Sequence, residues 1–188
     1  MGVSPRLRTE RAALVPYEAR HLSARTVAWL NDPVTVRYSE QRHRRHTLET
    51  SRAWVEAMTG GPHHLWAIEE TALGLGHVGN LAAYVNPANA LADLSILLGE
   101  PRARGLGLGL EAWRAGLDWL LGPGGMRKVT AGTLGENLPM LAVMRASGMV
   151  PDGIRLRHYL FEGHAVDVVH MAAFAASGPF GRQEGFPL

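Results

Sequence analysis

The sequence predicts an α/β protein of the α+β kind, in which helices flank a mixed, mostly antiparallel sheet of about seven strands. Apolar segments with an alternating pattern follow one another across short turns, which is typical of β-hairpins. One strand–helix–strand unit spans Ala90 to Thr133, and such a unit joins parallel strands. The chain has 188 residues, 46% of them hydrophobic, so a single domain can bury a well-filled core.

The N-terminal half is expected to form an edge strand, two helices and three further strands. Leu7 to Val15 is apolar enough for the edge strand. A helical apolar pattern over Ala19 to Leu30 ends at Asn31-Asp32-Pro33, which stops a helix. A second helix begins at Thr47 and runs to Met58, although Thr50 stands where a capping box carries Glu. Turn-forming residues then separate three expected strands, which cover His64 to Glu69, Gly76 to Val85 and Ala90 to Leu98.

The C-terminal half is expected to alternate helices and strands and to finish in a tail. The clearest helix covers Gly109 to Leu121 and is closed by a Gly-Pro-Gly-Gly segment. A strand over Lys128 to Thr133, a helix over Asn137 to Ser147 and two late strands over Ile154 to Phe161 and Val166 to Phe174 complete one domain, residues 1–176. Residues 177–188 contain three Gly and two Pro without periodicity, so we expect a flexible tail.

Composition excludes several classes of protein. The chain has no cysteine, which rules out disulfides, cysteine-ligated zinc, iron–sulfur clusters and a cysteine thioester intermediate. The formal net charge of +2 is small for a broadly basic nucleic-acid binder. No apolar run approaches the ~20 residues of a membrane span, and the first residues lack the apolar middle of a signal peptide. We therefore expect a cytoplasmic protein with no nucleic-acid or membrane partner.

Two glycine-rich segments match phosphate-binding patterns, and they differ in the element expected after each of them. Gly74 to Gly79 reads G-x-G-x-x-G, but a strand is expected after it instead of the helix that a dinucleotide site requires. We interpret this segment as a hairpin turn. Arg104 to Gly109 lies between an expected strand and the clearest expected helix. Converging N–H groups and the helix dipole would make this turn an anion site for a diphosphate; the alternative is a flexible connection.

The second segment, Arg104-x-x-Gly107-x-Gly109, resembles the acetyl-CoA pyrophosphate motif of the GNAT acetyltransferase superfamily. The following Glu111-Ala112 is similar to the RimJ/RimL-like subgroup, which acetylates ribosomal-protein N-termini and amino sugars. Residues 137–149 resemble the family's Asn-led helix that ends in a Gly–aromatic pair, with Met149 in place of the aromatic residue. The resemblance covers roughly Leu7 to Phe174 and implies the GNAT fold.

The resemblance implies an acyltransferase (EC 2.3.1.-) that uses acetyl-CoA, and no metal, to acetylate a primary amine directly. The backbone of the glycine turn would bind the pyrophosphate, and the strand before it would pair with the pantetheine arm. A backbone N–H near Leu97 would polarise the thioester carbonyl, and Asn137 would touch the pantetheine arm. The candidate coenzyme-binding residues are Ile96, Leu97, Leu98, Arg104, Gly105, Leu106, Gly107, Leu108, Gly109, Leu110 and Asn137.

Asp93 and Ser95 are the candidate catalytic residues. Asp93 interrupts an apolar strand, and the two-residue alternation of a strand places it on one face with Ser95. Many members of the family carry a Glu general base at this position; the alternative is a hydrogen-bonded Asp near a strand end. Met144 and Met140 occupy the family's positions for a Tyr or Ser acid. Neither can donate a proton, so we expect both in the apolar wall or core, and the general acid is not identified.

The polar segment between the first two helices is the expected acceptor side. It holds three Arg and two His, which could clamp a phosphorylated acceptor or could form a solvated basic loop. Its two His lack a third ligand in register, so we expect no metal there. The candidate substrate-binding residues are Tyr38, Glu40, Arg42, His43, Arg44 and Tyr84.

These patterns favour an acetyl-CoA-dependent N-acetyltransferase whose acceptor is a small-molecule amine such as an amino sugar. One alternative is a protein N-terminal acetyltransferase of the ribosomal-protein type. Another is an acyl-CoA-binding module without catalysis, which the two methionines keep open. The expected oligomeric state is a monomer or a homodimer.

Overall fold

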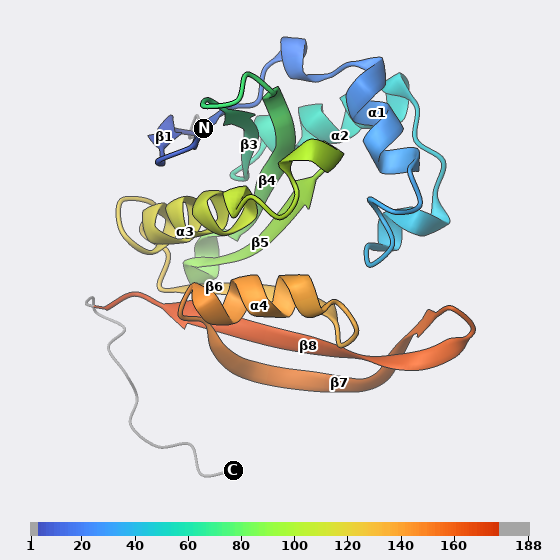
Figure 1. Cartoon of the computed structure of the whole chain (residues 1–188). Coiled ribbons are helices and arrows are strands. Elements are labelled where there is room, and N and C mark those ends of the chain that lie inside the picture. Colours follow the sequence, from blue (N-terminus) through green and yellow to red (C-terminus); the bar gives the residue numbers. More distant parts are fainter. Residues whose placement is uncertain (1–3, 177–188) are drawn as a thin grey trace.

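The computed structural model describes residues 4–176, which form one mixed sheet flanked by helices (Figure 1). Its eight strands lie in the order β1-β2-β3-β4-β5-β6-β8-β7. The strands are β1 (Leu7–Arg8), β2 (Ala12–Pro16), β3 (His64–Glu70), β4 (Gly76–Asn86), β5 (Leu91–Leu98), β6 (Lys128–Leu134), β7 (Val150–Phe161) and β8 (His164–Phe174). The helices are α1 (Ala24–Asn31), α2 (Leu48–Gly60), α3 (Leu108–Leu121) and α4 (Leu138–Ala146), with short 3-10 turns η1 (Ala19–His21), η2 (Glu40–His43), η3 (Pro87–Asn89) and η4 (Pro101–Ala103). The predicted fold class is confirmed, and the predicted tail lies outside the described residues.

Two N-terminal elements are shorter than predicted. The single edge strand expected over Leu7 to Val15 is two strands, because the Thr9 hydroxyl bonds the backbone of Ala12 in both directions and turns the chain. The helix expected from Ala19 is interrupted before Ser23. Ser23 caps α1, since its hydroxyl accepts from the N–H of Thr26, and a side chain that caps a helix competes with helical backbone before it.

Helix α2 begins after Thr47 as predicted, and its cap is stronger than its sequence suggests. The Thr47 hydroxyl accepts from the Thr50 N–H at 3.1 Å, and the Thr50 hydroxyl accepts from the Thr47 N–H at 2.9 Å. Threonine therefore completes the reciprocal box that usually contains Glu.

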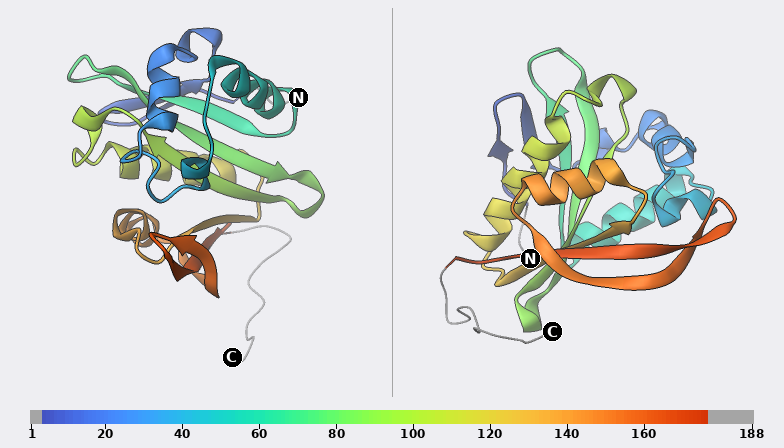
Figure 2. Two further views of the ribbon diagram at one scale, coloured as in Figure 1. Left: turned by 90° about the vertical axis from the view of Figure 1, so that its right-hand side faces the viewer. Right: turned by 60° about the horizontal axis from the view of Figure 1, so that its bottom comes forward.

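The hydrophobic core lies on both faces of the first five strands. Helix α3 packs on one face, where Trp66, Leu81 and Trp113 are almost completely buried. Helix α2 packs on the opposite face, where its Met58 is buried together with Leu65 of β3. Helix α4 lies beside α3 and covers β6 (Figures 1 and 2). Within the described residues, no helix has the length and apolar character needed to cross a membrane.

The sheet separates into two parts between β5 and β6. These strands are parallel, as the strand–helix–strand pattern predicted, but they pair only at three positions: Leu91 with Lys128, Ala92 with Val129, and Asp93 with Thr130. Beyond Asp93 the strands diverge, and β6 continues to pair with β8 instead. The parts carrying β1–β5 and β6–β8 lie at an angle to each other in Figure 1, which leaves an open edge on β5.

Candidate active site

A cavity of about 880 Å³ opens where β5 and β6 separate. Its walls come from β4 and β5, from the start of α3, from β6 and α4, and from the chain between α1 and α2. A volume of this size is at the upper end of the range for small-molecule sites. Of the predicted site residues, twelve line the cavity: Tyr38, Glu40, Arg44, Tyr84, Asp93, Ser95, Ile96, Leu97, Leu98, Arg104, Gly109 and Asn137.

The glycine turn before α3 presents a run of free donors. Gly107 is the N-cap of α3, with φ at +80° and no side-chain cap. Within residues 4–176, the backbone N–H groups from Gly105 to Gly109 donate to no protein acceptor, whereas Leu110 and Glu111 both donate to the Gly107 carbonyl. Unpaired amides at the positive end of a 14-residue helix favour an anion. Gly105, Leu106, Gly107, Leu108 and Leu110 lie outside the cavity lining, on the turn and helix start next to Gly109.

The strand before the turn offers its open edge to the cavity. One edge of β5 pairs with β4 along its whole length, from Leu91 to Leu98. The other edge of β5 has no strand partner after Asp93. Every second residue of that free edge therefore directs its backbone N–H and carbonyl toward the gap. Ile96, Leu97 and Leu98 border this gap, which is the geometry that pairing with an extended ligand requires.

Arg104 and Asn137 lie in the cavity wall, but each has a protein partner. The Arg104 guanidinium donates to the Thr35 hydroxyl at 2.7 Å and to the Leu98 carbonyl at 3.4 Å. Asn137 caps α4: its Oδ1 accepts from the Met140 N–H, and its Nδ2 donates to the Thr133 hydroxyl at 2.9 Å. Both side chains therefore order the wall, in addition to any contact with a ligand.

Asp93 is the acid at the point where the strands divide. It lies opposite Tyr84 on β4 and opposite Thr130 on β6, and the Thr130 hydroxyl donates to its Oδ2 at 2.7 Å. Ser95 lines the cavity on the same face, as the alternation predicted. Water can reach Asp93 through the cavity, but desolvation by the surrounding protein raises the pKa of its carboxyl. The hydrogen bond from Thr130 and the charge of His170 act in the opposite direction and lower this pKa. A carboxylate with a raised pKa in a cleft is suited to proton transfer.

His170 is a site residue that the sequence analysis missed. It lies on β8 opposite Gly132, and its ring covers the space where a Gly132 side chain would begin: a Cβ there would be 2.9 Å from the ring. Its Nε2 is buried and has no partner within residues 4–176. A polar residue among Val168, Val169 and Met171 was the signal in the sequence, but only the pairing of β8 with β6 brings it to Asp93.

The acceptor side of the cavity differs in part from the prediction. Arg42 lies outside this cavity and borders a smaller neighbouring one, because its guanidinium bonds the carbonyls of Ser39 and Leu160 and pairs with Glu40 at 2.8 Å. His43 is exposed and borders neither. Arg45 and His46, which belong to the polar segment expected on the acceptor side, also line the cavity. The sequence analysis did not select further polar residues of the lining, among them Ser51, Asn80, Thr133 and Arg155.

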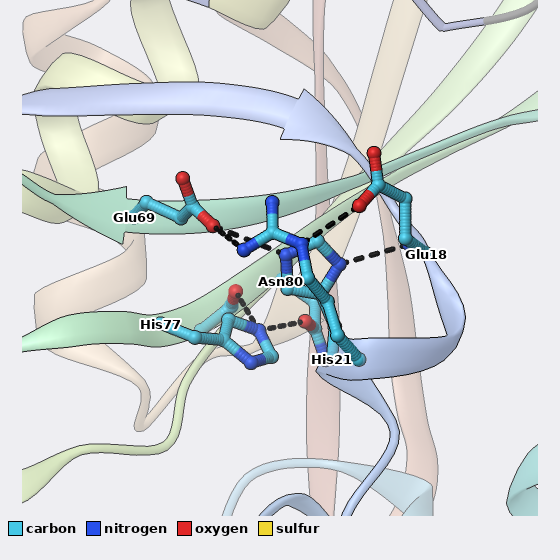
Figure 3. Close-up of polar contacts among 7 residues, drawn as sticks. Glu18, His21, Glu69, His77 and Asn80 are labelled. Carbon is cyan, nitrogen blue, oxygen red and sulfur yellow. Dashed lines mark hydrogen bonds and ion pairs between the residues drawn. The ribbon is translucent and has the colours of Figure 1, made fainter.

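Figure 3 shows how Asn80 is oriented. His77 Nε2 lies 3.0 Å from the Gly79 carbonyl, which can only accept, so Nε2 carries the proton and also donates to Asn80 Oδ1 at 2.9 Å. The Asn80 Nδ2 group has no hydrogen-bond partner within the described residues, and Asn80 lines the cavity. Burial lowers the pKa of His77, which keeps the ring neutral and this orientation constant near neutral pH.

Contacts of His21 with its neighbours, among them His77, fix η1 to the sheet. The Glu18 N–H donates to His21 Nδ1 at 2.8 Å, and His21 Nε2 lies 3.2 Å from a Glu69 carboxylate oxygen (Figure 3). The His21 and His77 rings are 5.0 Å apart, and Trp29 of α1 packs against His77 at 5.2 Å. These contacts hold the chain that leads to the acceptor side of the cavity.

Comparison with known proteins identifies the family. The model of the family described as "Acetyltransferase (GNAT) domain" matches residues 11–150. The chain belongs to the GNAT acetyltransferase family. The predicted GNAT family and the predicted class of enzyme, an acyltransferase, are thereby confirmed, whereas the predicted RimJ/RimL-like subgroup stays a prediction. No curated protein sequence matches this acetyltransferase.

Several solved structures are similar to this acetyltransferase. A GNAT-family acetyltransferase from Bacillus anthracis shares 17% identity with a TM-score of 0.76, over 92% of this chain and 100% of that chain. RimL, a ribosomal L7/L12 α-N-protein acetyltransferase in complex with coenzyme A, shares 16% identity with a TM-score of 0.77, over 90% and 98%. Spermidine N-acetyltransferase from Vibrio cholerae, in complex with CoA and spermine, shares 15% identity with a TM-score of 0.77, over 89% and 97%. At these identities the similarity shows a common fold.

Two methionines distinguish this acetyltransferase from the acid–base pattern expected of its family. Met144 is fully buried in the core that α3 and α4 share, and Met140 borders the cavity from α4. Both positions are apolar wall or core, as predicted, so α4 supplies no proton donor at either of them.

Proposed function

We propose that this acetyltransferase transfers an acetyl group from acetyl-CoA directly to the primary amine of a small molecule, with an amino sugar as the preferred acceptor class. The observation that carries the proposal is the position of Asp93. Its carboxylate lies at the branch point of β5 and β6, where the open edge of β5 leads to the free amides before α3. Acetyl-CoA supplies the acetyl group already activated as a thioester.

Two neighbouring parts of the chain are suited to bind the coenzyme. The amides from Gly105 to Gly109 are suited to the pyrophosphate, and the free edge of β5 from Ile96 to Leu98 is suited to the amide groups of the pantetheine arm. A backbone N–H on that edge, near Leu97, would stabilise the negative charge that develops on the thioester oxygen.

Asp93 acts as the base that removes a proton from the acceptor ammonium, directly or through water. Deprotonating a lysine-type amine at pH 7 costs about 4–5 kcal/mol, whereas an amine with a pKa near 8 costs about 1.4 kcal/mol. A carboxylate is a weak base, so the second kind of amine suits it better. Ser95 and the Thr130 hydroxyl lie on the same face and would orient the acceptor and Asp93. Because the methionines of α4 cannot donate, the leaving thiolate takes its proton from water or from another group of the site.

A protein N-terminal acetyltransferase of the RimJ/RimL type is the second candidate. The similarity to RimL supports it, and α-amines meet the same pKa condition. The cavity is lined by Arg44, Arg45, Arg104 and Arg155 against two carboxylates, which disfavours peptides with basic first residues.

Release of CoA thiol from acetyl-CoA, measured against a panel of amino sugars, short peptides and polyamines, tests both candidates. Turnover with amino sugars and none with peptides supports the first proposal. Turnover with peptides alone supports the second. Tight CoA binding without turnover on any amine would contradict both.

A further inference from the structure

Three arginines without a protein partner line the cavity. Arg44 and Arg45 precede α2 and also border the smaller neighbouring cavity, and Arg155 comes from β7. None of these three guanidinium groups makes an ion pair or hydrogen bond with any residue of the described chain. Of the two carboxylates in the cavity lining, Glu40 is paired with Arg42, and Asp93 is bonded to Thr130. The three arginines are therefore uncompensated.

Polar atoms without partners are concentrated in the same cavity. Five buried side-chain nitrogen or oxygen atoms lack a hydrogen bond within residues 4–176, and four of them belong to residues that line it: His46 Nε2, Ser51 Oγ, Trp113 Nε1 and His170 Nε2. A buried polar group without a partner costs about 1–3 kcal/mol. Ser51 is only 6% exposed, and it borders the cavity. A polar ligand in the cavity would provide partners for these atoms.

His46 and Ser51 are held next to the arginines by a rigid local structure. The Asn31 side chain of α1 accepts from the His46 N–H and donates to the His46 carbonyl, both at 2.9 Å. The capping box of Thr47 then starts α2, and the Ser51 N–H donates to the Thr47 carbonyl at 3.0 Å. The loop is thus fixed before any ligand arrives, which reduces the entropy cost of binding.

We propose that Arg44, Arg45, His46, Ser51 and Arg155 form a phosphate-binding subsite, and that the acceptor is a primary amine that also carries a phosphate ester. This inference rests on the proposed function. Three guanidinium groups, a hydroxyl and an imidazole provide more donors than a single carboxylate can accept, and they match the several oxygens of a phosphate dianion. The same charges repel a second ammonium group, so polyamines are poor acceptors.

Glucosamine 6-phosphate and glucosamine form a matched pair of probes, because they differ only in the phosphate. We expect kcat/KM for the phosphate ester to exceed that for the neutral sugar at least ~10-fold. Arg45→Gln and Ser51→Ala should lower kcat/KM for the phosphate ester through a higher KM, with little change for glucosamine. Arg52→Gln is the matched control, since Arg52 is an exposed neighbour on α2 that does not line the cavity. Equal kcat/KM for the two sugars, or equal losses in Arg45→Gln and Arg52→Gln, overturns the subsite.

Calorimetry separates this inference from the proposed function. Glucosamine 6-phosphate is titrated into the protein saturated with CoA, which has no acetyl group to transfer. The phosphate ester should bind at least ~10-fold more tightly than glucosamine, and more weakly as the salt concentration rises. Phosphate-dependent binding without turnover on any amine would contradict the transferase proposal and leave the subsite standing. Turnover on neutral amines with no phosphate-dependent binding would contradict the subsite and support the transferase proposal.

Discussion

Replacing Gly79 with alanine tests how closely β4 approaches the strand that we propose to bind the coenzyme. A Cβ at Gly79 would lie 2.2 Å from the Leu97 carbonyl oxygen and 3.1 Å from the Leu98 Cα. The first distance is roughly 1 Å short of van der Waals contact, and the atom met is backbone, which a side-chain rotation cannot move. Overpacking of this kind typically costs 1–3 kcal/mol, and we expect about 2–3 kcal/mol for a backbone clash.

The expected effect is measured by thermal unfolding and by calorimetric titration of CoA. For a chain of this size, each kcal/mol shifts Tm by about 2–4 °C, so Gly79→Ala should lower Tm by roughly 4–12 °C. CoA should bind ~10-fold more weakly, because displacement of the Leu97 backbone changes the open edge of β5. Gly60→Ala is the control, since a Cβ at Gly60 meets nothing within 4 Å. A wild-type Tm together with wild-type CoA affinity in Gly79→Ala would refute the reasoning.

Three further substitutions test the base and the glycine turn. Asp93→Asn should lower kcat ~10²–10⁴-fold with little change in KM for acetyl-CoA, and wild-type rates across pH 6–9 would remove Asp93 as the base. Because the folded state raises the pKa of Asp93, its ionisation lowers the stability of the fold as pH rises through that pKa. Asp93→Asn should therefore increase Tm at pH 7–8 and have no such effect at pH 3. An equal change in Tm at both pH values would contradict the burial argument. Thr130→Val removes a hydrogen bond that lowers this pKa, so the acid limb of the kcat/KM profile should move to higher pH. Gly107→Glu should abolish CoA binding, whereas Gly125→Glu, at a similar positive φ but distant in the chain, should preserve it; equal affinities would place the pyrophosphate elsewhere.

Regular patterns in the sequence predicted the elements that depend on local chemistry. Alternation on β5 placed Asp93 and Ser95 on the face that lines the cavity. The Gly74–Gly79 segment belongs to the β3–β4 hairpin, as its lack of a following helix indicated: Gly74 lies in the turn and Gly76 begins β4. The errors lie where a side chain redirects the backbone. Thr9 and Ser23 each form a local hydrogen bond that divides a predicted element, and neither bond has a periodic signature.

The candidate site was predictable only where it is continuous in sequence. The turn from Arg104 to Gly109 is such a segment, and so is β5. His170 and Arg155 lie more than 60 residues along the chain from Asp93, and they reach the cavity because β8 pairs with β6 and β7 pairs with β8. Arg42 and Arg44 are two positions apart in one polar segment, and only the tertiary partners of Arg42 show why it lies outside the cavity that Arg44 borders.

The short parallel ladder between β5 and β6 has a consequence for the motion of the whole domain. Three residue pairs join the strands there, and the packing of α3 against α4 and β6 adds to the connection between the two parts of the sheet. A long ligand in the gap touches both parts and replaces hydrogen bonds that neighbouring strands would otherwise share. Backbone amides on both sides of the gap should then exchange with deuterium more slowly once the ligand is bound, so occupancy stiffens the domain as a unit.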